Sequence, residues 1–75
     1  MEFNVSVQEL LKAIGTSNIK SIDDNHSDKM FIKLSNAIII GEPDWNYRVF
    51  SLVIVYEKER VKCVILNMLI DPLHS

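Results

Sequence analysis

The stretch Val49–Ile70, VFSLVIVYEKERVKCVILNMLI, decides the fold because 15 of its 22 residues are apolar. Most of them are β-branched or aromatic, the types that favour strands, and the charged group EKER at 57–60 divides them into two runs of strand length. A tight turn at Lys58 and Glu59 would place Glu57 opposite Arg60 as a favourable cross-strand charge pair. The sequence therefore predicts a C-terminal β-hairpin.

Counting outward from this turn assigns the apolar residues of the hairpin to two faces. One face is expected to carry Phe50, Leu52, Ile54, Tyr56, Val61, Cys63, Ile65 and Leu69, and the other Val49, Val53, Val55, Val64, Leu66, Met68 and Ile70. Two apolar faces are typical of strands that are covered on both sides. The cover must come from the middle of the chain, from sheet curvature or from another molecule.

The N-terminal segment predicts a short amphipathic helix. Ser6 and Glu9 have the spacing of a capping box, and Val5 with Leu10 has that of a hydrophobic staple. Apolar residues follow at helical spacing, and Gly15 provides a left-handed residue that ends the helix; the stripe comprises Val7, Leu10, Leu11 and Ile14. A helix this short is unstable alone, so we expect it to pack on the hairpin.

The middle of the chain leaves two structures open. A second helix at about residues 28–40 could be capped by Ser27 and ended by Gly41. A strand pair turning at Ser35 and Asn36 is favoured instead, since four of these residues are isoleucines. With a short strand at 18–22, the sequence predicts an α+β fold for a single small domain, residues 1–75: one helix packed on an antiparallel sheet of three to five strands, with the C-terminal hairpin as its core.

Composition narrows the classes of function. The net charge is −2, with eight basic against ten acidic residues, so we expect no nucleic-acid partner. No apolar run reaches the roughly 18 residues of a membrane span, and the first residues lack the pattern of a signal peptide. The one cysteine, Cys63, lies in an apolar run and is expected to be a buried structural thiol. A cytoplasmic protein without membrane contact is the expectation.

The polar segment Asp23–Asp28 does not make a convincing metal site. Its spacing begins like a calcium loop, but Asp28 stands where that loop requires glycine and Leu34 where it requires glutamate. His26 has no second imidazole or thiolate nearby in the sequence. A solvated turn is the favoured interpretation. We therefore expect no metal, no cofactor and no catalytic residue.

Partner binding is expected around the only tryptophan. Pro43 sets a rigid corner, after which Trp45, Tyr47 and Arg48 belong to the types most enriched in binding hot spots. The candidate partner-binding residues are Glu42, Asp44, Trp45, Tyr47 and Arg48. Alternatively, Trp45 covers one end of the core, as a large side chain that is seldom fully buried.

The leading functional hypothesis is a non-enzymatic protein that acts by protein–protein interaction. An inhibitor, an immunity protein or an antitoxin-like module fits this profile, with another protein or a second copy as partner, and a homodimer is expected. A second hypothesis is a small ribonuclease that resembles RelE-like toxins in architecture alone; its candidate residues are Tyr47, Arg48, Lys58, Arg60 and Lys62. A third is a structural subunit of a larger complex.

Overall fold

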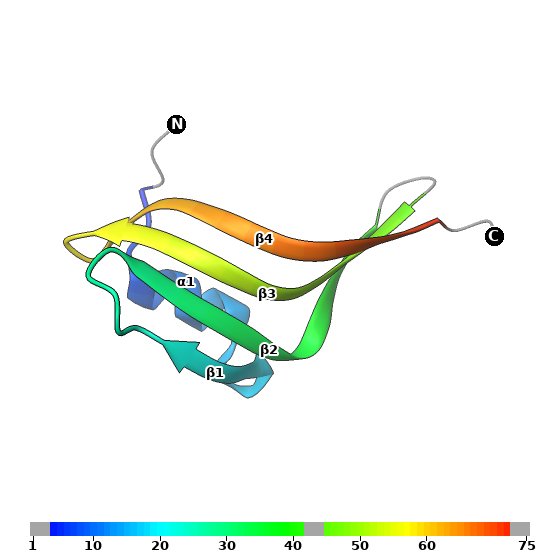
Figure 1. The fold of residues 1–75 in the computed structure, drawn as a ribbon, viewed down its shortest axis with the longest axis horizontal. Helices are drawn as coiled ribbons and strands as arrows, with labels where there is room; N and C mark the ends of the chain where they lie inside the picture. Colours follow the sequence, from blue (N-terminus) through cyan, green and yellow to red (C-terminus); the bar gives the residue numbers. More distant parts are fainter. Residues whose placement is uncertain (1–3, 42–44, 73–75) are drawn as a thin grey trace.

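The computed structural model describes residues 4–41 and 45–72 and contains one short α-helix beside a four-stranded antiparallel sheet (Figure 1). The elements are α1 (Val7–Ile14), a 3-10 turn (Thr16–Asn18), β1 (Ile19–Asp23), β2 (Lys29–Gly41), β3 (Trp45–Glu57) and β4 (Arg60–Pro72). The strands lie in the order β1-β2-β3-β4. The predicted helix and antiparallel sheet are confirmed, with the sheet as the dominant part.

The helix α1 forms as the sequence predicts. The hydroxyl oxygen of Ser6 accepts a hydrogen bond from the Glu9 N–H at 3.1 Å, and the Glu9 carboxylate accepts one from the Ser6 N–H at 3.2 Å. At the other end Gly15, with φ +91°, donates its N–H to the carbonyl oxygen of Leu11 at 3.0 Å. Both ends therefore satisfy backbone groups that a two-turn helix leaves without partners.

The residues before α1 join the outer edge of β4. The Val61 N–H donates to the Val5 carbonyl at 3.0 Å, and the Val7 N–H donates to the Glu59 carbonyl at 2.8 Å. Ser6 thus lies opposite Arg60 in an isolated antiparallel bridge. This pairing fixes where α1 begins relative to the sheet.

The turn between β3 and β4 is the predicted one. Glu57 lies opposite Arg60, while Lys58 and Glu59 both have positive φ, at 50° and 67°. Two left-handed central residues give the turn the twist that a two-residue hairpin needs. The prediction of a Lys58-Glu59 tip is confirmed.

The predicted alternative of a helix at residues 28–40 is wrong, because this segment is the strand β2. The turn expected at Ser35 and Asn36 is absent as well. Instead, pairing with β3 shifts between Lys33 opposite Ser51 and Ile38 opposite Val49. The three additional residues on β2 form a wide bulge, and the strand bends sharply there (Figure 1).

Two smaller bulges change the register predicted for the hairpin. Tyr56 pairs with Val61 but Val55 pairs with Cys63, so Lys62 is an extra residue in β4. Since side chains alternate between faces, every later residue of β4 moves to the face opposite the predicted one. Near the middle of β3, Phe50 is a second extra residue, between the pairs that Val49 and Ser51 make with β4.

The bulges determine which apolar residues share a face of the sheet. We call the face that α1 packs on the helix face; by strand pairing it carries Met30, Ile32, Ile38, Ile40, Trp45, Tyr47, Val49, Leu52, Ile54, Tyr56, Val61, Val64, Leu66, Met68 and Ile70. The other, open face mixes polar residues with apolar ones; its members include Phe31, Lys33, Ser51, Val53, Val55, Cys63, Ile65, Asn67 and Leu69. Both faces of the hairpin thus carry apolar residues, as predicted, but the members of each face differ from the predicted ones.

The core is small. It consists of the buried residues Val7, Ile32, Leu34, Val49, Leu52, Ile54 and Val61, so the hairpin shares it with α1 and β2. The radius of gyration is 13.4 Å, whereas about 11 Å is expected for a compact domain of this length. The accessible surface is 5637 Å² for 8.6 kDa, against roughly 4,700 Å² for a typical monomer of that mass. The molecule is elongated and exposes about 900 Å² more than usual.

Candidate interaction surface

Part of the sheet projects beyond α1. Residues 38–41 of β2, 45–49 of β3 and 68–72 of β4 form a three-stranded end, the sheet extension, on which neither described helix lies (Figure 1). The helix face of the extension, together with the adjoining Leu66, exposes six large apolar side chains, which we call the extension surface: Ile38, Ile40, Trp45, Leu66, Met68 and Ile70. The helix face is thus apolar along the whole sheet but covered over only part of it.

The sequence creates the extension through strand length. The strands β2, β3 and β4 each have 13 residues, while α1 has eight and β1 five. An eight-residue helix is about 12 Å long, whereas a strand of 13 residues spans roughly 43 Å. One helix of this length leaves much of the sheet uncovered. The surplus length appears as the 44 Å long dimension of the molecule.

The opposite side of the extension is also partly apolar. Ile39 is 63% exposed and Leu69 is exposed as well, with Arg48 paired between them. Arg48 is the one charged residue among the side chains that the structure describes in the extension.

The structure brings some of the predicted partner-binding residues together and separates others. Trp45 is 45% exposed at the start of β3, and Tyr47 lies half-buried between Ile40 and Ile70 on the same face. Arg48 lies on the other face. Glu42 and Asp44 lie outside the described residues. Trp45 belongs to the extension surface and stands apart from the buried cluster.

Sequence reasoning missed five members of this surface: Ile38, Ile40, Leu66, Met68 and Ile70. The consecutive isoleucines at 38–40 and the apolar end of β4 were signals of burial or contact. Because a turn was predicted at Ser35 and Asn36, the pairing of residues 38–41 with β3 was not expected.

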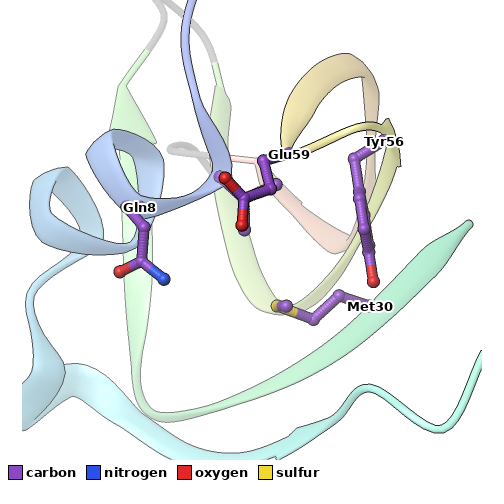
Figure 2. Close-up of a pocket in the computed structure, with 5 residues that line it drawn as sticks. Gln8, Met30, Tyr56 and Glu59 are labelled. Carbon is purple, nitrogen blue, oxygen red and sulfur yellow. The ribbon is translucent and has the colours of Figure 1, made fainter.

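A pocket of about 140 Å³ lies at the other end of the sheet, between α1 and the hairpin turn. Figure 2 shows the side chains of Gln8, Met30, Tyr56 and Glu59 around it, and Val7 completes the lining. Sites for small organic ligands usually enclose about 300 to 1,000 Å³. This pocket is too small for such a ligand.

The polar turn after β1 makes local contacts. The Asp23 carboxylate accepts a hydrogen bond from the Asn25 N–H at 3.1 Å, as in an Asx turn. His26 packs edge-on against Phe31, with ring centroids 5.0 Å apart. Within residues 4–41 and 45–72, no three His, Cys, Asp or Glu side chains gather as a metal site would require.

The cationic residues considered for RNA binding do not form one group. Lys58, Arg60 and Lys62 lie at or next to the hairpin turn, where the Arg60 guanidinium donates to the Asn4 side-chain oxygen at 3.2 Å. Tyr47 and Arg48 lie at the far end of β3. The length of that strand separates the two groups.

Cys63 is exposed, which corrects the prediction of a buried thiol. The cause is the extra residue Lys62, which places Cys63 opposite Val55 on the open face. Val64 lies opposite Ile54 on the helix face, the place that the regular register would give to Cys63.

Comparison with known proteins identifies no relative. No protein-family model matches the chain, and neither the curated proteins nor the solved structures compared with it give a match. In the part of the chain that the structure describes, no helix combines the length and apolar character needed to cross a bilayer.

Proposed function

We propose that this chain is a non-enzymatic protein that acts by protein–protein interaction, with the extension surface as its main contact. The observation that carries the proposal is the mismatch between an apolar helix face and a helix that covers only part of it. Large contiguous apolar patches are rare on monomers and usually mark an interaction site.

The size of the patch sets a scale for the affinity. Its six side chains are roughly half exposed, so covering each contributes about 1 kcal/mol. The total, on the order of 6 kcal/mol, is similar to the cost of association. The extension surface alone therefore supports a weak contact. A stable complex needs further contacts, and an edge of the sheet beside the patch is positioned to provide them.

The alternatives receive less support from the geometry. A ribonuclease needs its cations and its proton-transfer groups around one phosphate, whereas Tyr47 and Arg48 lie far along β3 from the turn cations. A subunit of a larger complex would use the same surface, and would differ by being insoluble without its partners.

Radical footprinting tests the proposal directly. Hydroxyl radicals oxidise accessible side chains, so Trp45 and Met68 report on the extension surface. Phe31 and Ile22, which are similarly exposed away from it, are the matched controls. Labelling is measured on the purified full chain and again after it is mixed with extract of its native cells. We expect Trp45 and Met68 to be protected relative to the controls in at least one of these settings.

A second variant ties protection to the surface. Ile40→Lys together with Ile70→Lys adds two charges to the extension surface away from the core, so the fold should persist while protection of Trp45 and Met68 is lost. Each labelling rate is divided by the intrinsic reactivity of its residue type. If the corrected rates of Trp45 and Met68 equal those of the controls in both settings, no polypeptide covers the surface and the proposal is overturned.

A further inference from the structure

The outer edge of β4 is closed at one end and open along the rest. β4 is the last strand of the sheet, so one side of it has no neighbouring strand. The N-terminal segment closes the first part, through the bonds of Val5 and Val7 to Val61 and Glu59. Within the described residues, no bridge or strand pairs with the outer edge from residue 63 onward.

Strand geometry shows which backbone groups this edge presents. The Tyr56 N–H donates to the Asp28 carbonyl at 2.9 Å, so the backbone of Tyr56 faces β2. Since successive residues face opposite neighbours, Val55 and Val53 face β4 and bond to their partners Cys63 and Ile65. The alternate residues of β4 then direct their N–H and C=O groups outward: Val64, Leu66, Met68 and Ile70.

The composition of the edge is unusual for one that remains exposed. Natural sheets protect edge strands with lysine, proline, bulges or a covering segment. Here the bulge and the lysine coincide at Lys62, beside the part that the N-terminal segment already covers. The following residues, CVILNMLI at 63–70, contain no charge, proline or glycine. The open part of the edge has the features of a pairing strand.

We propose that the open edge of β4 pairs antiparallel with the same edge of a second copy, around a two-fold axis at Asn67. This inference rests on the proposed function and names the partner. Leu66 then bonds to Met68 of the second copy, and Val64 bonds to Ile70 of the second copy. By symmetry, all four outward residues of each copy are hydrogen-bonded.

Two requirements select this register: the outward backbone groups of the two copies must meet, and their helix faces must lie on the same side of the joined sheet. All four outward residues have even numbers and belong to the helix face, so only registers that pair even with even residues join bonding groups and keep the faces aligned. An axis at Leu66 would leave Ile70 without a partner. The axis at Asn67 uses the whole edge and joins the two helix faces into one eight-stranded sheet.

An antiparallel strand edge can pair with an identical edge that is related to it by a two-fold axis. Because the edge complements itself, a second copy satisfies it without any other component. The extension surfaces of the two copies then lie on the same side of one sheet.

Cysteine cross-linking tests the register. Asn67→Cys with Cys63→Ser places two thiols at the axis in a non-hydrogen-bonded pair, with Cα atoms about 4.5 Å apart, within the range of about 4.4 to 6.8 Å for disulfides. The matched control, Ile65→Cys with Cys63→Ser, lies two residues away on the same face. Its Cα atoms would be about 13 Å apart along the strands. Under mild oxidation we expect the Asn67→Cys protein to become a covalent dimer and the control to stay largely monomeric.

Light scattering coupled to size exclusion provides the second measurement. We expect the wild-type chain to be a dimer that dissociates on dilution, and Leu66→Pro to be a monomer with an unchanged circular dichroism spectrum, because proline removes only an outward N–H. Equal cross-linking of both cysteine variants, or a wild-type monomer at all concentrations, would overturn the inference. If the chain is monomeric but Trp45 and Met68 are protected in extract, the partner is not a second copy and the proposed function stands. If the chain is monomeric and these residues are not protected, both the dimer and the proposed function are rejected.

Discussion

The Val61 N–H and the Val5 carbonyl oxygen, 3.0 Å apart, join the residue before the helix cap to a buried residue of β4. This bond lies between two local motifs, the capping box at Ser6 and the turn at Lys58 and Glu59. Each motif is specified by a few adjacent residues, and the bond holds them in one arrangement. The start of the chain thus fixes α1 on the helix face and closes the adjoining part of the sheet edge.

Replacing Ser6 by alanine should destabilise the protein by about 1 kcal/mol, because the Glu9 N–H loses its acceptor at the N-terminus of α1. Chemical denaturation measures the change. Glu9→Gln is the matched control, since glutamine can still accept from the Ser6 N–H and complete the box. Loss of stability in Glu9→Gln but not in Ser6→Ala would show that the charge of Glu9, rather than the hydroxyl of Ser6, stabilises this end.

Replacing Lys58-Glu59 by Asn-Gly should stabilise the protein by about 1 kcal/mol. Both residues now hold positive φ, which costs an ordinary residue roughly 1–2 kcal/mol, and Asn-Gly is the preferred pair for this turn. Thermal and denaturant unfolding measure the gain. A double alanine variant keeps the conformational cost and serves as the control; it should not gain stability, and a similar gain there would contradict the explanation.

Two isoleucines of β2 test the contrast between the buried and the exposed part of this strand. Ile32 is 1% exposed and Ile39 is 63% exposed, so Ile32→Ala should cost about 2–5 kcal/mol, as cavities in a core do. Ile39→Ala should cost less than about 1 kcal/mol, since it leaves no cavity. Denaturant unfolding of the two variants is the measurement. Comparable losses would mean that the far part of β2 is buried in the isolated chain.

Local sequence signals predicted the parts of the fold that depend on neighbouring residues. Ser6 with Glu9 marked the helix start, Gly15 its end, and the charged group around Lys58 the hairpin turn. Each of these signals acts through hydrogen bonds or dihedral angles within a few residues. The short strand β1 also formed within one residue of its predicted bounds.

The bulges were not predictable in the same way. Alternation of polar and apolar residues normally reveals the register, but here neighbours such as Val64, Ile65 and Leu66 are apolar whichever face they occupy. Bulges at Phe50 and Lys62 involve no glycine that would signal them. Ser35 and Asn36 are turn formers, so they predicted a hairpin. In the structure, pairing with β3 on both sides of these residues makes the segment one continuous strand. Register and extension depend on contacts between distant strands.

The thiol of Cys63 tests the bulge at Lys62. Because Cys63 is exposed while Val61 is 2% exposed, a small neutral thiol reagent should modify Cys63 in the native protein nearly as fast as in denaturant. In the matched variant, Val61→Cys with Cys63→Ser, modification should require local unfolding and be slower by orders of magnitude. Slow labelling of Cys63 would indicate that the hairpin has the regular register, without the bulge at Lys62.

Amide hydrogen exchange along β4 tests the direction of its backbone groups. Cys63, Ile65 and Asn67 bond to β3, so their amides should exchange slowly at every concentration. Val64, Leu66 and Met68 face the open edge, so their amides should exchange fast in dilute protein. NMR measures the rates residue by residue.

The concentration dependence of the same rates separates the fold from the assembly. If a second copy pairs with β4, the fast amides of Val64, Leu66 and Met68 become slow as the protein concentration rises, while Cys63 and Ile65 stay unchanged. If fast and slow amides alternate along β4 at all concentrations, the strand geometry is supported and pairing at this edge is excluded. Uniform slow exchange down to the lowest concentration, in a protein that light scattering finds monomeric, would contradict the assigned backbone directions, because an open edge cannot protect alternate amides.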